Sequence, residues 1–193
     1  ETTLFYADRR DTPRSSVEAI LEAQGVQPAP GLKVEAIACS DWIDRVPTSL
    51  QYLPARLQEL SFARNAAHRI LRRHPEAAVI SRELETARHL VRAGHVHTHL
   101  ELHRVPGGAT RRRWLLEAAA GCRSIIAISG GVREDLIALG VDAEKITVEH
   151  DAYDPALFDQ LPDKAAARAE LELEPERPVV VYTGGLLVWK GVD

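Results

Sequence analysis

Short apolar runs alternate with helical patterns along most of this chain, and no other feature of the sequence constrains the fold as strongly. The expected strands cover residues 4–7, 33–38, 77–81, 96–102, 124–129 and 146–149. The expected helices cover residues 15–21, 53–73, 83–93, 111–120 and 132–139. Parallel strands need long crossover connections, which are usually helices. The alternation therefore predicts an α/β fold with a mostly parallel sheet and helices on both faces.

Composition narrows the class of protein. Of the 193 residues, 45% are hydrophobic and 27% are charged, which is typical of a soluble globular protein with a real core. The net charge of -4 argues against a nucleic-acid-binding surface over the whole molecule. Cys39 and Cys122 stand far apart in apolar contexts, which favours buried free thiols in a reducing compartment. The sequence has neither a membrane-length apolar run nor a signal peptide, so we expect a cytoplasmic protein.

A change of composition predicts a domain boundary near Leu161. Residues 159–177 are rich in Ala and Glu, with Pro162 and Pro175 inside this stretch and Pro178 just after it, which is typical of a linker with one amphipathic helix. We therefore expect a first domain over residues 1–161. Residues 162–193 are expected to form the linker and the first strand of a second, truncated domain.

The final apolar run, from Val179, reads as a buried strand that leads into a glycine turn. Gly184 and Gly185 leave the backbone accessible there, and Lys190 follows closely. Backbone N–H groups and an ammonium in this arrangement are suited to binding a phosphate.

Polar residues directly after the expected strands are the main candidates for a site, because parallel α/β sheets bind ligands at the carboxyl ends of their strands. These residues are 8–10, 81–83, 101–104, 129–131, 150–151 and 184–185. His103 should emerge there beside Arg104, with Glu101 two positions back on the same strand face. A general acid/base or a ligand of a substrate hydroxyl would stand at this position.

Histidines at positions 95, 97, 99 and 103 raise the question of zinc. Residues two apart on a strand are separated by roughly 6.6 Å, so at most two neighbours could share one ion. We expect His95, His97 and His99 to be hydrogen-bonded residues in or near the start of the strand, and we expect no metal site. A zinc-dependent hydrolase that uses this strand remains an alternative.

Two further features have two readings each. Ser129 before Gly130-Gly131 is either a helix cap or the start of a helix whose free N–H groups face a ligand. The basic runs are either solvated helix faces or contacts with an anionic acceptor or an anionic membrane surface. These runs are Arg69 with Arg72-Arg73, and Arg111-Arg112-Arg113 with Trp114.

From about Val79 onward, the order and spacing of several segments resemble the retaining GT-B glycosyltransferases of family 4. The segments are "HLELHRVPGG", "RSIIAISGGVREDL", "KITVEHDAYDPALF" and "VYTGGLLVWKG". The last resembles the opening of that family's donor domain, although Gly185 stands where an arginine is usual. The resemblance implies the N-terminal half of a GT-B fold, which is Rossmann-like.

The resemblance also implies roles for individual residues. His103 would face the reacting sugar, and Lys190 with the Gly184-Gly185 backbone would hold the donor diphosphate. Four residues would line the cleft, with Ser129 near the crevice between domains: Glu101, Arg104, Ser129 and Asp151. The nucleotide-sugar donor is a substrate, and neither a cofactor nor a metal is expected.

The expected function is transfer of a sugar from a nucleotide sugar, with retention and without a protein nucleophile. The acceptor would be a sugar or a lipid-linked molecule. The family's acidic donor-site motif would lie beyond Asp193, so we expect this chain alone to be inactive. The alternative from another class is a non-catalytic Rossmann-like binding or scaffold domain.

Overall fold

The computed structural model describes residues 1–9, 19, 21, 30–153, 155, 158–159, 161–184 and 191. The chain forms two compact units, Glu1–Asp151 and Ala152–Asp193. Of the helix expected over residues 15–21, only Ala19 and Leu21 are among the described residues, and both are helical.

All strands in the described part of the chain belong to the first unit and are parallel to their neighbours. They are β1 (Thr2–Asp8), β2 (Leu32–Ala38), β3 (Val79–Ser81), β4 (Thr98–Leu102), β5 (Ser124–Ala127) and β6 (Ile146–Val148). β1 pairs with β2, and the other four form one sheet in the order β3-β4-β5-β6. Parallel strands joined by helices confirm the predicted α/β, Rossmann-like fold.

Helices follow the strands as the apolar periodicity predicts. The α-helices within the described ranges are α2 (Tyr52–Arg73), α3 (Leu84–Arg92), α4 (Ala109–Gly121), α5 (Gly130–Leu139) and α6 (Lys164–Glu170). Short 3-10 turns are η1 (Ile43–Arg45), η2 (Thr48–Leu50) and η3 (Ala143–Lys145). Helix α5 ends at Gly140, whose φ of 103° lies in the left-handed region that favours glycine.

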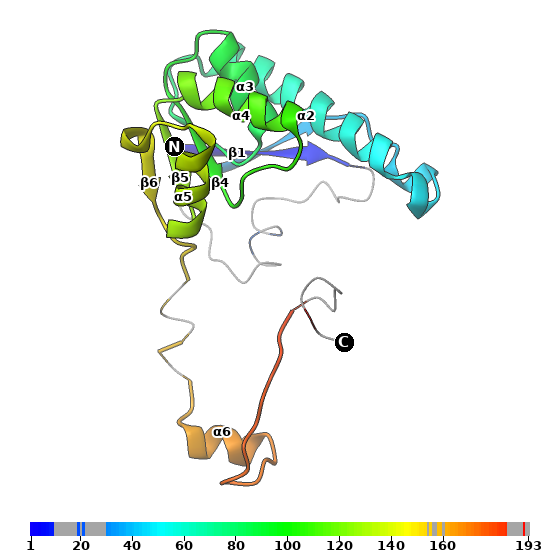
Figure 1. Cartoon of the computed structure of the whole chain (residues 1–193). Coiled ribbons are helices and arrows are strands. Elements are labelled where there is room, and N and C mark those ends of the chain that lie inside the picture. The colour runs from blue at the N-terminus through cyan, green and yellow to red at the C-terminus, as the bar shows by residue number, and fades with distance from the viewer. Residues whose placement is uncertain are drawn as a thin grey trace. The chain divides into compact units, whose positions relative to one another are not determined.

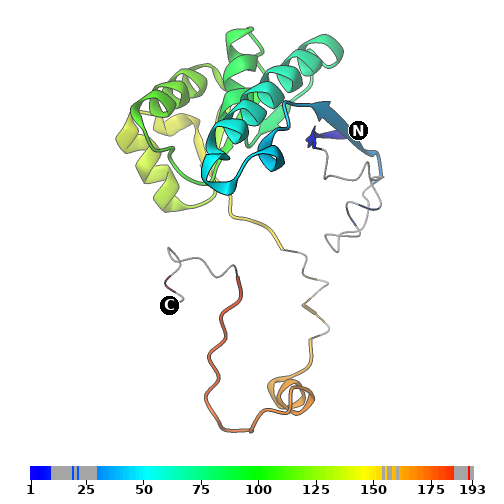
Figure 2. The same cartoon turned by 90° about the vertical axis from the view of Figure 1, so that its right-hand side faces the viewer.

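Helices α2, α3 and α4 lie side by side in one layer (Figures 1 and 2). The spacing between α3 and α4 depends on a glycine. A Cβ atom added at Gly121 would lie 2.1 Å from Cγ1 of Val91, which is far inside van der Waals contact. Any larger residue at position 121 would therefore push these two helices apart.

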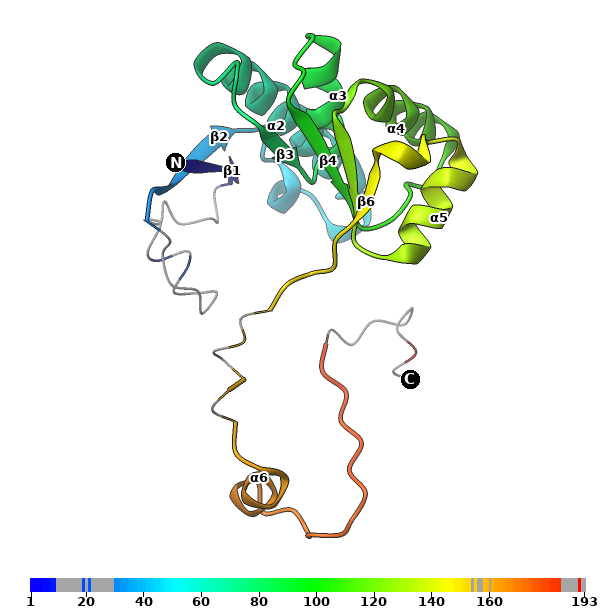
Figure 3. The ribbon, with the colours of Figure 1, turned by 90° about the vertical axis from the view of Figure 1, so that its left-hand side faces the viewer.

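The main core lies between the four-stranded sheet and helices α3, α4 and α5. Its fully buried members include Ala87, Leu100, Leu115, Ala118, Ile125, Ala127 and Leu136. Along β4, Leu100 and Leu102 are buried, while His99 and Glu101 are half-buried. Because side chains alternate along a strand, His99 and Glu101 occupy the face opposite this core. Figure 3 shows the strands in front, with α2 and α3 behind them.

A smaller cluster connects the two sheets. Ala67 and Ile70 from α2 and Leu90 from α3 are buried together, and Phe5 of β1 and Val79 of β3 pack against them. The β1-β2 pair and the four-stranded sheet thus share apolar cover from the same helices.

The second unit contains α6 and an extended segment. The Asp163 carboxylate caps α6 by accepting the Ala166 N–H at 2.8 Å. The buried strand predicted from Val179 is wrong for this structure. Residues 179–184 form no strand, and Val180 is 98% exposed. A strand needs a partner backbone, and no other strand forms in the described part of this unit. The domain boundary near Leu161 stays a prediction.

Candidate functional site

The carboxyl ends of β3, β4, β5 and β6 meet at one edge of the sheet, because these strands are parallel and adjacent. β3 ends at Ser81 and is followed by Arg82, and β4 ends at Leu102 and is followed by His103. His103 therefore stands at the position that the sequence predicted for it.

Three side chains from the first two of these strand ends are in contact. His103 Nε2 lies 2.8 Å from Oε1 of Glu101. Arg82 reaches both partners, because its Nε lies 3.1 Å from the same Glu101 oxygen and its Nη2 lies 2.7 Å from His103 Nε2. We call Arg82, Glu101 and His103 the triad. Arg82 is its exposed member, with 65% of its side chain accessible, against 34% for His103 and 24% for Glu101.

The triad holds His103 Nε2 between a donor and an acceptor. When this nitrogen carries a proton, it donates to Glu101 and has nothing to offer the Arg82 N–H. When it is unprotonated, it accepts from Arg82 but its lone pair faces the Glu101 carboxylate. Only one of the two contacts of Nε2 is a good hydrogen bond at any time.

The loop after His103 adds positive potential to this edge. Arg104 is exposed, and α4 begins soon after it at Ala109, with Gly108 as an N-cap that offers no side chain and with no acid in the first turn. Arg112 Nε donates to the Pro106 carbonyl oxygen at 3.3 Å, which ties the loop to α4. An uncapped helix start carries partial positive charge on its free N–H groups.

The next two strand ends carry Ser129 and Asp151. The Ser129 hydroxyl accepts the Val132 N–H at 3.3 Å, so its role as a helix cap is confirmed. His150 Nδ1 donates to the Ile128 carbonyl oxygen at 2.9 Å and links the ends of β5 and β6. Asp151 follows as an exposed residue at the end of the first unit. No contact between Ser129 or Asp151 and the triad is present.

A family model described as Glycosyltransferase Family 4 matches residues 12–157. The chain belongs to Glycosyltransferase Family 4. The matched region contains every strand from β2 to β6 and the whole triad. A search of curated proteins gave no match. Membership of this family makes the chain a glycosyltransferase domain, so a sugar donor and an acceptor are its substrates in general terms.

This glycosyltransferase domain also contains a buried ionic cluster among helices α2, α3 and α4. The Glu85 side chain is only 3% exposed and accepts hydrogen bonds from Arg56 of α2 and Arg111 of α4. Burial, with the nearby Glu85 and Glu59 carboxylates, raises the pKa of Glu83 above its usual range. The cluster joins the N-terminal parts of α2, α3 and α4.

The other histidines of this region have structural partners. His95 is buried, with Nδ1 2.8 Å from the Thr98 hydroxyl, and its ring packs edge-on against that of His97. His99 Nδ1 lies 2.7 Å from the Ser124 hydroxyl. The prediction of hydrogen-bonded histidines is therefore confirmed for His95 and His99. Within the described ranges, no three His, Cys, Asp or Glu side chains come close enough to hold a metal ion.

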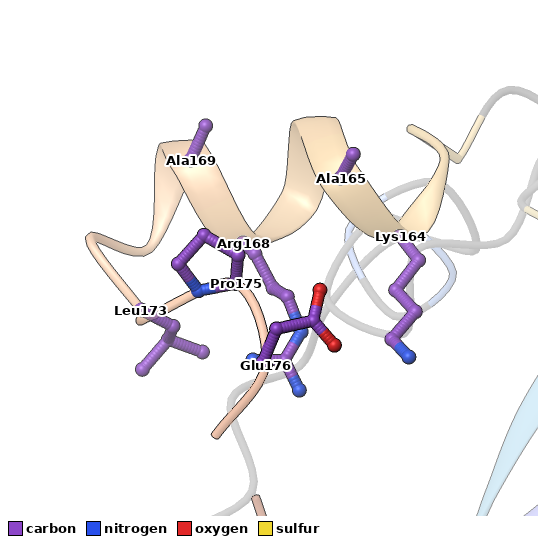
Figure 4. Close-up of a pocket in the computed structure, with 7 residues that line it drawn as sticks. All are labelled: Lys164, Ala165, Arg168, Ala169, Leu173, Pro175 and Glu176. Carbon is purple, nitrogen blue, oxygen red and sulfur yellow. The ribbon is translucent and has the colours of Figure 1, made fainter. Parts of the chain in front are cut away.

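The predicted phosphate-binding residues belong to the second unit. Gly184 is exposed, and Gly185 and Lys190 lie outside the described residues. A pocket of about 310 Å³ lies between α6 and the segment that follows it (Figure 4). Its guanidinium, from Arg168, already donates to the carbonyl oxygens of Glu174 and Arg177. Lys164 and Glu176 add one charge of each sign to the lining, and the other lining residues are Ala165, Ala169, Leu173 and Pro175.

Arg82 is the functional candidate that sequence reasoning located without giving it a role. Its position directly after β3 was the available signal. Its contact with Glu101 and His103 depends on the register of β3 and β4, in which Ser81 pairs with Leu100, and no local pattern in the sequence encodes that register. Among the described residues, none of the helices has the length and apolar character of a membrane span.

Proposed function

We propose that this chain is the acceptor-side half of a retaining GT-B glycosyltransferase, in which His103 faces the reacting sugar. The observation that carries the proposal is the contact of His103 with Glu101 at the carboxyl end of β4, inside the region that matches the family. A histidine held by a carboxylate keeps a fixed ring orientation, which a hydrogen bond to a sugar hydroxyl requires.

The donor would be a nucleotide sugar whose diphosphate leaves with the electrons of the broken glycosidic bond. Negative charge grows on that diphosphate in the transition state, and preorganised donors stabilise it. Lys190 and the backbone of Gly184 and Gly185 are the groups we assign to this task. Because retention is proposed to occur without a protein nucleophile, we assign no nucleophilic side chain. We also assign no metal or cofactor to the reaction.

Arg104, Ser129 and Asp151 are assigned to the walls of the cleft. Arg104 and Asp151 are exposed and follow the ends of β4 and β6, which supports this assignment. The acceptor is a sugar or a lipid-linked molecule, and the reaction is assigned to the cytoplasm.

Contact with an anionic membrane surface is a second part of the proposal. Leu53, Leu57 and Arg64 share one face of α2 by their spacing, and all three are exposed. Leu50 and Tyr52 extend the apolar end of this face, with 62% and 79% exposure. A surface that joins aliphatic side chains to an arginine suits a bilayer with anionic lipids, to which one arginine contributes about 1 kcal/mol.

The experiment that tests the proposal uses the complete enzyme with uridine, guanosine and adenosine diphosphate sugars. Release of nucleoside diphosphate is measured, and the anomeric configuration of any product is determined by NMR. Turnover of one donor with retention supports the proposal, whereas inversion or a lack of turnover with every donor contradicts it. This chain alone is expected to release no diphosphate.

Membrane contact is tested by flotation with vesicles of phosphatidylglycerol or of phosphatidylcholine alone. We expect binding to the anionic vesicles only, and weaker binding by Leu53→Glu. Leu173→Glu, on the second unit, is the matched control and should bind normally. Equal binding to both kinds of vesicle would contradict an electrostatic contribution.

A further inference from the structure

Arg82 is an exposed cation whose present contacts cannot all be satisfied. It shares one Glu101 oxygen, Oε1, with His103, and its own Nη2 competes for His103 Nε2. In either protonation state of Nε2, one close contact pairs two donors or two acceptors. Arg82 Nε keeps its ion pair with Glu101 in both states, whereas the Nη2 contact with His103 costs little to lose when a better acceptor arrives.

The surroundings of Arg82 favour an anion as that acceptor. Arg104 is exposed on the next strand end, and α4 starts nearby without a cap or an acid in its first turn. Among the acids beside these residues, Glu101 is already paired with the Nε side of Arg82, and burial raises the pKa of Glu83. A guanidinium is suited to hold an oxyanion through two parallel N–H bonds.

We propose that Arg82 is a specificity residue that binds an oxyanion group of the acceptor, a phosphate or a carboxylate, and thereby sets the state of His103. When Arg82 turns to the oxyanion, the contact with Nε2 is lost. His103 is then held by Glu101 alone, as the tautomer with its proton on Nε2. That proton comes from Nδ1 through solvent, so the net charge of the ring does not change, and Nδ1 becomes an acceptor.

This inference rests on the proposed function for the identity of the ligand as an acceptor. It adds that an acceptor with an oxyanion fixes the tautomer of His103. An uncharged analogue would leave the contact between Arg82 and His103 unchanged. An anionic acceptor would therefore be recognised and would prepare the histidine in a single event.

The test is a titration of this chain, labelled with ¹⁵N in its histidine rings, with inorganic phosphate, acetate and glucose at constant pH and ionic strength. We expect phosphate, acetate or both to move the His103 ring resonances toward the Nε2-protonated tautomer, while the His97 ring stays unchanged. Glucose should have no effect. A response to one anion alone identifies the class of oxyanion. A His103 ring that responds to neither anion overturns the proposal.

Arg82→Gln should abolish the response, and Arg82→Lys should retain part of it. Arg123→Gln is the matched control, because Arg123 is an exposed arginine at the opposite end of the sheet, just before β5. A response that persists in Arg82→Gln overturns the proposal. Thermal melts verify that each variant is folded. No sugar transfer is measured here, so failure of the proposed reaction and failure of the Arg82 inference are separate results.

Discussion

Glu101 and His103 project from the same side of β4 and its extension, and Oε1 of the first lies 2.8 Å from Nε2 of the second. The Glu101 side chain is 24% accessible to solvent, and the His103 side chain is 34% accessible. A half-buried acceptor next to a more exposed ring is an arrangement that orients the ring. We therefore expect Glu101 to position His103.

Glu101→Gln in the complete enzyme should lower kcat by about tenfold, because a charge-assisted bond to His103 is replaced by a weaker neutral one. Steady-state kinetics check this expectation. Glu149→Gln, at an exposed position after β6, is the control. Equal kcat values for the two variants would show that Glu101 has no role in the reaction.

Glu85→Gln should destabilise the first unit by about 3 kcal/mol, because it leaves Arg56 and Arg111 without their shared, buried carboxylate. Urea denaturation measures the loss. Glu59→Gln is matched to it, since Glu59 also pairs with Arg56 but its side chain is 43% exposed. That variant should change stability by less than about 1 kcal/mol. A similar loss in both variants would show that burial of Glu85 is unimportant.

Stability should fall as the pH drops below about 6.5, the pKa of an unfolded histidine. Burial, followed by the nearby His97, lowers the pKa of folded His95 below that value. The unfolded chain then binds the proton more readily, so this contribution is full above pH 6.5 and decreases below it. His89 has a lowered pKa for similar reasons and acts in the same direction.

The contribution of His95 is isolated by comparing the free energy of unfolding at several pH values in the natural chain, His95→Gln and His97→Gln. The slope between mildly acidic and neutral pH should be clearly smaller in His95→Gln and only slightly smaller in His97→Gln, because burial is the larger cause of the lowered pKa of His95. Identical slopes in all three proteins would refute the role given to His95.

Gly121→Ala should destabilise the α3–α4 contact by about 1–3 kcal/mol, since the new methyl group would overlap Val91. Val91→Ala removes the overlapping atoms at the cost of a small cavity. The double variant should therefore lose less stability than the sum of the two single losses. Strict additivity in denaturant unfolding would mean that these residues do not meet.

The sequence allowed the order of strands and helices to be predicted, because each element carries its own periodicity. The position of His103 could also be predicted, since a residue directly after a parallel strand lies at the carboxyl edge. The contact between Arg82 and Glu101 could not, because it depends on how two strands align. The same holds for Glu85, whose two arginines come from helices distant in sequence.

The error at Val179 has a different cause. An apolar run of β-branched residues predicts a strand, but a strand forms only where another backbone accepts its hydrogen bonds. Within residues 161–184 no such partner is present, and the run is exposed. The apolar, β-branched composition of this run is typical of a strand, but it carries no information on whether a partner strand is present.

The central claim is that His103 faces the reacting sugar. Its most direct test compares the turnover of His103→Ala with that of His97→Ala in the complete enzyme. Both replace a partly accessible histidine on the same stretch of chain, but only His103 lies at the carboxyl end of β4. We expect His103→Ala to lose about 10²-fold or more in kcat while keeping its melting temperature. His97→Ala should keep normal turnover. Equal turnover in the two variants would contradict the account.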